Sequence, residues 1–283
     1  MNTTKDTKLL GVFGKPLAHT LSPKIHSYFI EKTGKDMSYL AFEIESAEAL
    51  KPIVEALTKM DARGFNITAP YKIDIMKCID FIDPEAEIME AVNTIVNRDG
   101  KWYGYNTDGD AFVKSLEDVV GDLKGKKVLM LGAGGAARGV AYKLAKKEIE
   151  SITFFAKTKK RAETIGEIVT KHSDCSIFYE LDKQDEYDII INTTPLGMHP
   201  YESENPFSEH MGMINEETVC CDLIYNPKKT VFLEESQKRG AKILNGLGMF
   251  VLQAVYAYEH FCDVKLNDDI IKGAMELLSD YSV

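Results

Sequence analysis

One lysine in this 283-residue sequence stands where it could take part in proton transfer. The stretch FNITAPYK, residues 65–72, predicts a short buried strand that stops at Pro70 and then presents Lys72. A lysine just past a strand end, behind a turn fixed by proline, is either a solvated surface charge or a group directed into a cleft. In a cleft it could donate a proton to an oxygen that gains negative charge. The stretch alone leaves both interpretations open.

A glycine-rich turn lies near the middle of the chain. The residues GAGGAA at 132–137 follow an expected strand, 128–131, and open an alanine-rich helical pattern, so they fit the dinucleotide-binding form G-x-G-x-x-A. Such glycines let backbone N–H groups approach a pyrophosphate at the positive end of a helix. Glycines also form turns for structural reasons alone, but the strand before and the helix after favour nucleotide binding. The predicted cofactor residues here are Gly132, Gly134, Gly135 and Ala136.

Cations follow the next expected strand. A site that prefers NAD usually places an acidic residue about 20 residues beyond the glycine turn, where it binds the ribose hydroxyls. This chain has instead Lys157, Thr158, Lys159, Lys160 and Arg161. A cluster of cations suits a 2′-phosphate, so the sequence favours NADP over NAD. The alternative is that these residues are surface charges flanking a helix.

The composition limits the classes of partner. The 44 acidic residues outnumber the 34 basic ones, and the net charge of −10 disfavours nucleic acid and anionic membrane as main partners. No run approaches the roughly 18 apolar residues of a membrane span, and no signal peptide is recognisable at the start. The five cysteines form no C-x-x-C pair and the six histidines no H-x-x-x-H spacing. We therefore expect no disulfide framework, no metal and a cytoplasmic location.

Strand-like and helical segments alternate along the first part of the chain. Such alternation is typical of βα units and a largely parallel sheet. The stretch 93–108 differs, because Asp99-Gly100 between two β-rich runs predicts a hairpin. The expected elements before it are strands at 9–14, 39–44 and 65–68 and helices at 23–35 and 47–60.

A second α/β series begins at about residue 127. The apolar pattern weakens just before it, over 116–126, which indicates a domain boundary, and the chain length favours about two domains. From Leu247 the chain is helical in character. The further expected strands are SITFFAK, DIIINTTP, VCCDLIY and AKILNG. The sequence therefore predicts an α/β fold of two domains, one of them a Rossmann dinucleotide-binding domain.

Short motifs in both halves of the chain, taken in order, resemble those of the shikimate dehydrogenase family. The resemblance runs over nearly the whole chain, from GVFGKPLAHTLSPKIH at 11–26 to GLGMFVLQA at 246–254. Each motif is short, but the set in this order is highly specific. The matching motifs are Thr20-Leu21-Ser22-Pro23, Asn66-Ile67-Thr68-Ala69-Pro70-Tyr71-Lys72, Ala91-Val92-Asn93-Thr94, Asn106-Thr107-Asp108-Gly109, Asn192-Thr193-Thr194-Pro195-Leu196-Gly197-Met198 and Asp222-Leu223-Ile224-Tyr225-Asn226-Pro227.

The resemblance implies an activity and a domain organisation. It implies an NADP-dependent enzyme that reversibly reduces 3-dehydroshikimate to shikimate, in the pathway to aromatic amino acids. It also implies that the C-terminal helices return to the N-terminal domain. The substrate domain would then comprise residues 1–112 and 247–283, with a mostly parallel sheet, and the Rossmann domain residues 113–246.

The resemblance further implies roles for individual residues. Lys72 would be the principal acid and base, with Asp108 positioning it and sharing the hydrogen bonds to the substrate. The cofactor-binding residues would be those of the glycine turn together with Lys157, Thr158, Arg161, Thr194 and Gly246. The substrate-binding residues would be Thr20, Ser22, Asn66, Thr68, Asn93, Tyr225 and Gln253.

Several of these residues also have structural interpretations. Asp108 could cap the helix that follows it, and Ser22 could cap the helix before Pro23. Asn93 could be a turn residue beside the hairpin, and Gln253 a polar residue in the core.

Two positions depart from the family pattern and leave specificity open. Thr20 replaces the usual serine, and its stiffer side chain could alter the choice between shikimate and quinate. Lys157 replaces an arginine and loses the planar fork that binds phosphate, so the preference for NADP could be less strict. The rival hypotheses are a quinate/shikimate dehydrogenase with relaxed cofactor use and a non-catalytic quinate or shikimate sensor. A sensor should lack Lys72 or Asp108, and this chain has both. A monomer and a homodimer both remain open.

Overall fold

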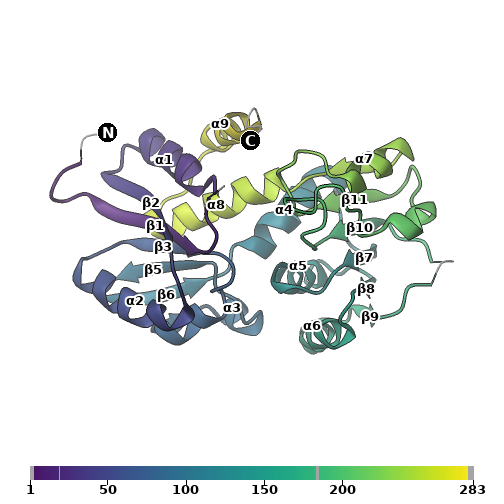
Figure 1. The fold of residues 1–283 in the computed structure, drawn as a ribbon, viewed down its shortest axis with the longest axis horizontal. Coiled ribbons are helices and arrows are strands. Elements are labelled where there is room, and N and C mark those ends of the chain that lie inside the picture. Colours follow the sequence, from purple (N-terminus) through teal and green to yellow (C-terminus); the bar gives the residue numbers. More distant parts are fainter. Residues whose placement is uncertain (1–2, 19, 183–184, 280–283) are drawn as a thin grey trace. The chain divides into compact units, whose positions relative to one another are not determined.

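The structure is a computed structural model that describes residues 3–18, 20–182 and 185–279. The described chain divides into two units. Unit 1 runs up to Thr107 and resumes at Gln253–Ser279, and unit 2 comprises Asp108–Leu252. The boundaries predicted from the sequence, at 112/113 and 246/247, stay a prediction. Each unit is an α/β structure built around its own sheet (Figure 1).

The sheet of unit 1 is mixed. Its strand order is β2-β1-β3-β5-β6-β4, with β1 parallel to β2 and β3, and β5 antiparallel to β3 and β6. The change of direction follows from the hairpin, because the chain turns back at once between β5 and β6. The strands are β1 (Lys8–Gly14), β2 (Met37–Glu43), β3 (Gly64–Ile67), β4 (Phe81–Ile82), β5 (Thr94–Arg98) and β6 (Lys101–Tyr105).

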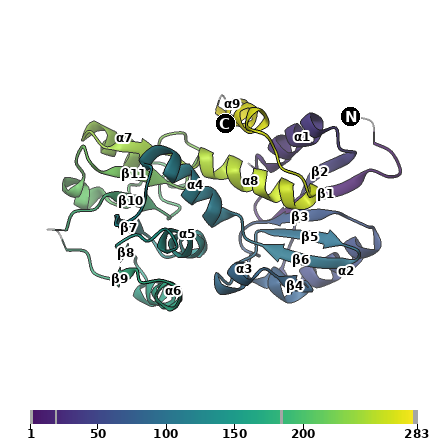
Figure 2. The ribbon, with the colours of Figure 1, turned by 180° about the vertical axis from the view of Figure 1, so that it is seen from behind.

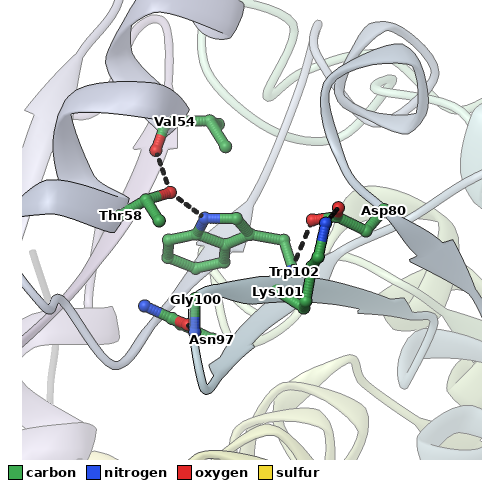
Figure 3. Close-up of polar contacts among 7 residues, drawn as sticks. All are labelled: Val54, Thr58, Asp80, Asn97, Gly100, Lys101 and Trp102. Atoms are coloured by element: carbon green, nitrogen blue, oxygen red, sulfur yellow. Dashed lines mark hydrogen bonds and ion pairs between the residues drawn. The ribbon is translucent and has the colours of Figure 1, made fainter.

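The hairpin forms at the predicted position and is anchored by Trp102. Asp99 and Gly100 have φ of 52° and 80°, the left-handed backbone that a two-residue hairpin turn requires. The indole Nε1 of Trp102 donates to Thr58 Oγ1 at 2.7 Å, and its backbone N–H donates to Asp80 at 2.9 Å (Figure 3). This side chain is 2% exposed. The hairpin is therefore fixed to helix α2 (Leu50–Lys59) as well as to its neighbouring strands.

Helices cover the sheet of unit 1. Leu50, Val54 and Leu57 of α2 are buried in a hydrophobic core. The stacked rings of Phe13 and Phe65 belong to the same core. α1 and α9 lie side by side in both views (Figures 1 and 2). The remaining helical segments are α1 (Ser22–Thr33), α3 (Pro84–Ile88), α9 (Asp268–Ser279), η1 (Ala47–Ala49) and η2 (Asp74–Cys78), while α8 (Leu247–Cys262) begins in unit 2 and ends in unit 1.

The sheet of unit 2 is parallel throughout. Its order, β12-β11-β10-β7-β8-β9, is the doubly wound arrangement of a Rossmann domain, with β7 and β10 at the centre. Alternate residues of β7 face two different cores: Val128 and Met130 one, Leu129 and Leu131 the other. A strand covered on both faces needs apolar residues throughout, as the buried residues VLML at 128–131 are. The strands are β7 (Lys127–Leu131), β8 (Ser151–Phe155), β9 (Ser176–Phe178), β10 (Ile189–Asn192), β11 (Val219–Asp222) and β12 (Lys242–Leu244).

Helices α4, α5 and α6 form a packed series in unit 2, in which α5 contacts both of the others. α7 packs on the other half of the sheet, against β11 and β12. These segments are α4 (Asp108–Val120), α5 (Gly135–Ala145), α6 (Lys159–His172) and α7 (Val231–Lys238), with η3 (Ser208–Met213). The two-domain α/β fold with a Rossmann sheet is thus confirmed. Among the described residues, no helix has the length and apolar character needed to cross a bilayer.

Candidate active site

Lys72 lies in a turn between β3 and η2 of unit 1 and is half-buried. Its position is fixed through the backbone, because its carbonyl accepts from Val92 N at 2.9 Å. Tyr71 beside it is buried, and its hydroxyl donates to the carbonyl of Ile44. Thr68, at the end of β3, donates its N–H to Phe13 O at 2.8 Å. The backbone that carries Lys72 is therefore held on both sides, and the lysine does not extend from a loose loop.

Thr20 and Ser22 form a small hydroxyl pair in front of α1. The Thr20 hydroxyl lies 3.2 Å from Ser22 Oγ, and Thr20 Oγ1 accepts from Ser22 N at 3.3 Å. The helix begins at Ser22 itself, and the residue at the N-cap is Leu21. The alternative interpretation of Ser22 as the N-cap is therefore wrong, and its hydroxyl belongs to the pair with Thr20.

A buried polar network connects Asn66 to Asn93 in unit 1. Asn66 accepts from the Tyr39 hydroxyl at 2.8 Å and donates to Thr94 Oγ1 at 3.1 Å. The Thr94 hydroxyl donates to Asn93 Oδ1 at 2.9 Å, and Asn93 Nδ2 donates to Thr107 Oγ1 at 2.9 Å. Such a chain fixes which end of each amide faces which neighbour. Both predicted substrate amides are thus held in one orientation.

The network ends on α8. The Thr107 hydroxyl lies 3.1 Å from the carbonyl oxygen of Gln253, which is also a predicted substrate residue. Its backbone is therefore connected to Asn93 through one threonine. The Gln253 side chain is half-buried. Asn106, next to Thr107, donates to Ala91 O at 3.0 Å. Unit 1 thus connects Asn66 in β3, Asn93 just before β5 and the backbone of Gln253 in α8.

His26 packs against Tyr39, one member of this network. Its ring stacks on that of Tyr39, with centroids 4.2 Å apart and planes 3° from parallel. The side chain is fully buried, and neither ring nitrogen has a hydrogen-bond partner among the described residues. The neighbouring polar side chain is that of Asn66. Burial lowers the pKa of His26 from 6.5 to about 3, so the imidazole is neutral near neutral pH.

In unit 2 the glycine turn lies between the end of β7 and the start of α5. Gly132 has φ +99°, and a Cβ there would lie 2.8 Å from Thr194 Cγ2. A Cβ at Gly134 or Gly135 would meet no heavy atom within 4 Å. Both glycines are exposed, and no side chain caps the helix at Gly134. The start of α5 is therefore exposed, and because the first N–H groups of a helix have no partner within it, this place fits the pyrophosphate of a dinucleotide. Ala136 follows in the first turn.

The cation cluster lies at the carboxyl end of β8. Lys157 and Thr158 connect β8 to α6, with Thr158 at the N-cap, and Arg161 stands in the first turn of the helix. All three side chains are exposed. Because parallel strands end at the same edge of the sheet, this cluster and the glycine turn share an edge, as a cofactor that spans both requires.

The loops after β10 and β11 lie at the same edge. Asn192, the last residue of β10, accepts from the N–H of Thr194 at 2.9 Å and from its hydroxyl at 2.7 Å. Asp222, the last residue of β11, is 1% exposed and accepts from Asn192 Nδ2 at 3.0 Å. The Tyr225 ring is half-buried and lies 4.6 Å from Phe250 in α8, between centroids. Gly246 is buried, and a Cβ there would lie 2.0 Å from Leu223 O, so only glycine fits.

Asp108 is the first residue of α4 in unit 2 and is half-buried. Next to it, Gly109 faces α5: a Cβ there would lie 2.7 Å from Gly139 O. The following Asp110 pairs with Lys143 of α5 at 2.9 Å. The start of α4 is therefore held on the helix that follows the glycine turn.

Some residues of these networks were not assigned from the sequence. Tyr39 lies in an ordinary strand pattern and carries no recognisable signal. Thr107 lies in the motif 106–109, in which the resemblance implies a role only for Asp108. Asn192 and Asp222 were part of the quoted motifs, but no role was predicted for them. No group of three or more His, Cys, Asp or Glu side chains suited to a metal ion occurs within the described ranges.

The fold and these networks define a two-unit α/β protein with a dinucleotide-binding Rossmann unit. Comparison with known proteins identifies its family. Residues 12–95 match the family model described as the shikimate dehydrogenase substrate binding domain, and residues 114–219 the one described as shikimate / quinate 5-dehydrogenase. The chain belongs to the shikimate dehydrogenase family.

Individual relatives agree. A shikimate dehydrogenase (NADP(+)) of Methanococcus aeolicus is 40% identical over 274 residues, which cover 95% of this chain and 97% of that protein. A crystal structure of a shikimate dehydrogenase in complex with NADP+ has a TM-score of 0.88 at 37% identity, over 97% of this chain and 96% of the other. A structure of shikimate 5-dehydrogenase from Listeria monocytogenes, in complex with shikimate and NAD, has a TM-score of 0.88 at 34% identity, over 96% and 98%.

Proposed function

We propose that this chain is an NADP-dependent shikimate dehydrogenase, which reversibly reduces 3-dehydroshikimate to shikimate. The observation that carries the proposal is the likeness, over 95% of the chain, to a relative that bears this name and cofactor. The hydrogen-bonded amides of unit 1 and the open glycine turn of unit 2 support it, because they suit a polyhydroxylated ring and a dinucleotide respectively.

We infer that the substrate is bound by side chains already held in place. The Thr20 and Ser22 hydroxyls and Tyr225 would donate to the carboxylate of the substrate. Asn66, Asn93, Thr68 and Gln253 would bind the ring hydroxyls. Because Asn66 and Asn93 are locked by their own hydrogen bonds, little rotational entropy would remain to be lost when the substrate binds.

Lys72 is the proposed general acid. Bound NADPH would supply the hydride, and the carbonyl oxygen of the substrate gains negative charge as the hydride arrives. The Lys72 ammonium would hydrogen-bond that oxygen and transfer a proton to it, and in the oxidation direction the amine would take the proton back. Asp108 is proposed to orient Lys72 and to share the hydrogen bonds to the substrate.

The cofactor residues of unit 2 are proposed from their place at one sheet edge. Gly132, Gly134, Gly135 and Ala136 would hold the pyrophosphate, and Lys157, Thr158 and Arg161 the 2′-phosphate. Thr194 and Gly246 belong to the neighbouring loops. The 2′-phosphate is present only in NADP, and the exposed cations at the end of β8 favour it.

The proposal extends to the setting of the enzyme. We place it in the cytoplasm, as a monomer or a homodimer, acting on small molecules and not on nucleic acid. The net charge of −10 supports the last point, because nucleic-acid binding needs basic surface.

The test is an assay of the purified chain with shikimate and with quinate, each with NADP and with NAD. We expect turnover of shikimate with NADP to exceed the other three combinations. Absence of turnover with all four pairs, in protein shown to be folded by circular dichroism, would contradict the proposal and favour a sensor.

A second candidate function is a quinate/shikimate dehydrogenase with relaxed cofactor use. Two observations favour it: Thr20, which pairs with the Ser22 hydroxyl where the family usually has a serine, and the exposed Lys157 in place of an arginine. Comparable turnover of quinate, or with NAD, would support this function. Thr20→Ser and Lys157→Arg should then each restore selectivity, the first for shikimate and the second for NADP.

A further inference from the structure

The carboxylate of Asp222 is the most heavily hydrogen-bonded buried acid in the described part of unit 2. It is 1% exposed and accepts three hydrogen bonds. The donors are Asn192 Nδ2 at 3.0 Å, Thr230 Oγ1 at 2.8 Å and Ile224 N at 2.9 Å. Asn192 and Thr230 are also buried, at 0% and 1% exposure. A buried carboxylate with three fixed donors holds the segments that supply them in one arrangement.

The first segment is the loop that carries Thr194. Asn192 Nδ2 donates to both Asp222 and Leu196 O, at 3.0 Å each. Its Oδ1 is thereby turned to accept the N–H and the hydroxyl of Thr194. Thr194 in turn lies against the glycine turn, since a Cβ at Gly132 would be 2.8 Å from its methyl group. The orientation of one amide, set by Asp222, therefore determines where Thr194 stands.

The second segment leads to Tyr225 and Gly246. Ile224 donates its N–H to Asp222, and its own carbonyl accepts from Gly246 N at 2.9 Å. The adjacent Leu223 donates its N–H to Asn192 O at 3.1 Å. The backbone that precedes Tyr225 is thus held between Asp222, Asn192 and Gly246.

We propose that Asp222 is a positioning residue for cofactor binding, which fixes the loops of Thr194 and Gly246 at the carboxyl edge of the sheet through Asn192, Thr230 and Ile224. The inference rests on the proposed function, because Thr194 and Gly246 are cofactor residues only within it. Asp222 itself is buried beneath the loops and would not touch the cofactor.

An amide cannot replace this carboxylate. In Asp222→Asn, an NH₂ group in the place of Oδ2 would face the NH₂ group of Asn192, and in the place of Oδ1 it would face the N–H of Ile224. One donor then faces another in either orientation. The Asn192 amide could turn to relieve the first clash, but its NH₂ would then face the N–H of Thr194. The substitution should therefore loosen the Thr194 loop even though it conserves size.

The compensating variant is the exchange Asn192→Asp with Asp222→Asn. The carboxylate at position 192 still accepts both bonds from Thr194. The amide at position 222 donates one N–H to that carboxylate and the other to Thr230 Oγ1, and accepts from Ile224 N. The cost is at Leu196 O, where a hydrogen bond is replaced by a contact between two acceptor oxygens. The exchange thus restores the link between the two strands with its direction reversed.

The experiment measures NADP+ binding to the purified full chain by titration calorimetry, with thermal unfolding of each variant in parallel. We expect D222N to raise the Kd for NADP+ by about tenfold or more, the effect of one buried polar group left without its partner. The N192D/D222N exchange should recover most of that affinity. The matched control is Asp188→Asn. Asp188 precedes β10 at the opposite edge of the sheet and accepts from Lys127 N at 2.8 Å, so D188N should lower stability and leave the Kd unchanged.

Each result has a definite meaning. Weaker binding in D222N and recovery in the exchange support the proposal, and if D222N alone does not fold, recovery of folded, NADP+-binding protein by the exchange supports it equally. A D222N protein that is less stable but binds NADP+ like the parent chain, or an exchange that binds no better than D222N, overturns it. If the parent chain itself does not bind NADP+, the proposed function fails, and that outcome is distinct from both.

Discussion

At the scale of single residues, the proposed chemistry depends most on Lys72. Its side chain is half-buried, and its backbone is held by the bond from Val92 and by the buried Tyr71. A general acid is effective when its position is fixed before the substrate arrives, because little entropy is then lost in orienting it. The backbone that carries Lys72 meets that requirement.

We predict that Lys72→Met lowers kcat for shikimate oxidation about 10²- to 10⁴-fold, the usual contribution of a general acid or base. Methionine has a similar length and apolar stem, so the fold should be retained. NADP+ binding, measured by calorimetry, should not change, because the cofactor residues lie in unit 2. The control is Lys77→Met, an exposed lysine in the same unit paired with Asp74 at 3.5 Å. Full activity in K72M would exclude Lys72 as the proton donor.

At the scale of elements, the contact between α4 and α5 places Asp108. Gly109 is buried against Gly139, and the neighbouring pair Asp110–Lys143 holds the same turn of α4. α5 begins at the glycine turn, so the helix that would carry the pyrophosphate also supports the helix that begins with Asp108. The packing of α4 on α5 thus positions Asp108 relative to the predicted pyrophosphate-binding turn.

We predict that Gly109→Ala impairs both stability and turnover. The new methyl would lie 2.7 Å from the carbonyl oxygen of Gly139, a backbone atom that cannot move independently of α5. The overpacking should cost about 1–3 kcal/mol in the free energy of unfolding, measured by urea titration, and the displaced Asp108 should lower kcat.

The matched control for this prediction is Gly212→Ala. Gly212 lies in the same unit, and a Cβ there meets no heavy atom within 4 Å, so stability and turnover should both be kept. A G109A enzyme with the stability and kcat of the parent chain would show that the close approach of α4 and α5 is not needed.

The elements were largely readable from the sequence, whereas the links between them were not. The strand, turn and helix at 128–145 follow from local pattern, and so does the hairpin at Asp99-Gly100, because the residues that decide them are neighbours in the chain. Asn192 and Asp222 are 30 residues apart and meet only because β10 and β11 are adjacent parallel strands. That adjacency depends on the order of the whole sheet, so single-sequence pattern does not contain it.

The same distinction holds for the candidate residues. Lys72 was ambiguous from its own stretch and gained a role only through the family motifs. Tyr39 could not be found, since its partner Asn66 is 27 residues away on β3, two strands across the sheet.

At the scale of the whole molecule, one buried group in each unit, His26 in unit 1 and Asp222 in unit 2, should respond to acid with opposite sign. In unit 1, the pKa of buried His26 is lowered from 6.5 to about 3, so the unfolded chain binds the extra proton and stability falls as the pH drops below about 6.5. In unit 2, burial raises the pKa of Asp222 from 3.8 to about 6, so the folded state binds this proton more tightly than the unfolded chain. The contribution of Asp222 to the free energy of unfolding is therefore greatest below about pH 3.8 and is lost as the pH rises through about 6. Mild acid therefore weakens unit 1 through His26 while it relieves the buried charge of unit 2.

The only tryptophan makes the acid response of unit 1 measurable. Trp102 is buried in unit 1, with its indole bonded to Thr58 (Figure 3), so its fluorescence reports unit 1 alone. We predict that His26→Phe, which keeps an aromatic ring against Tyr39, removes a loss of stability that reaches about 2 kcal/mol at about pH 5. The measurement is the urea midpoint of Trp102 fluorescence at neutral pH and in mild acid. H26F should lose less stability in acid than the parent chain, and the exposed control His199→Gln should behave like the parent. An equal acid dependence in H26F and the parent chain would mean that other groups of unit 1, such as the half-buried His260, carry the response.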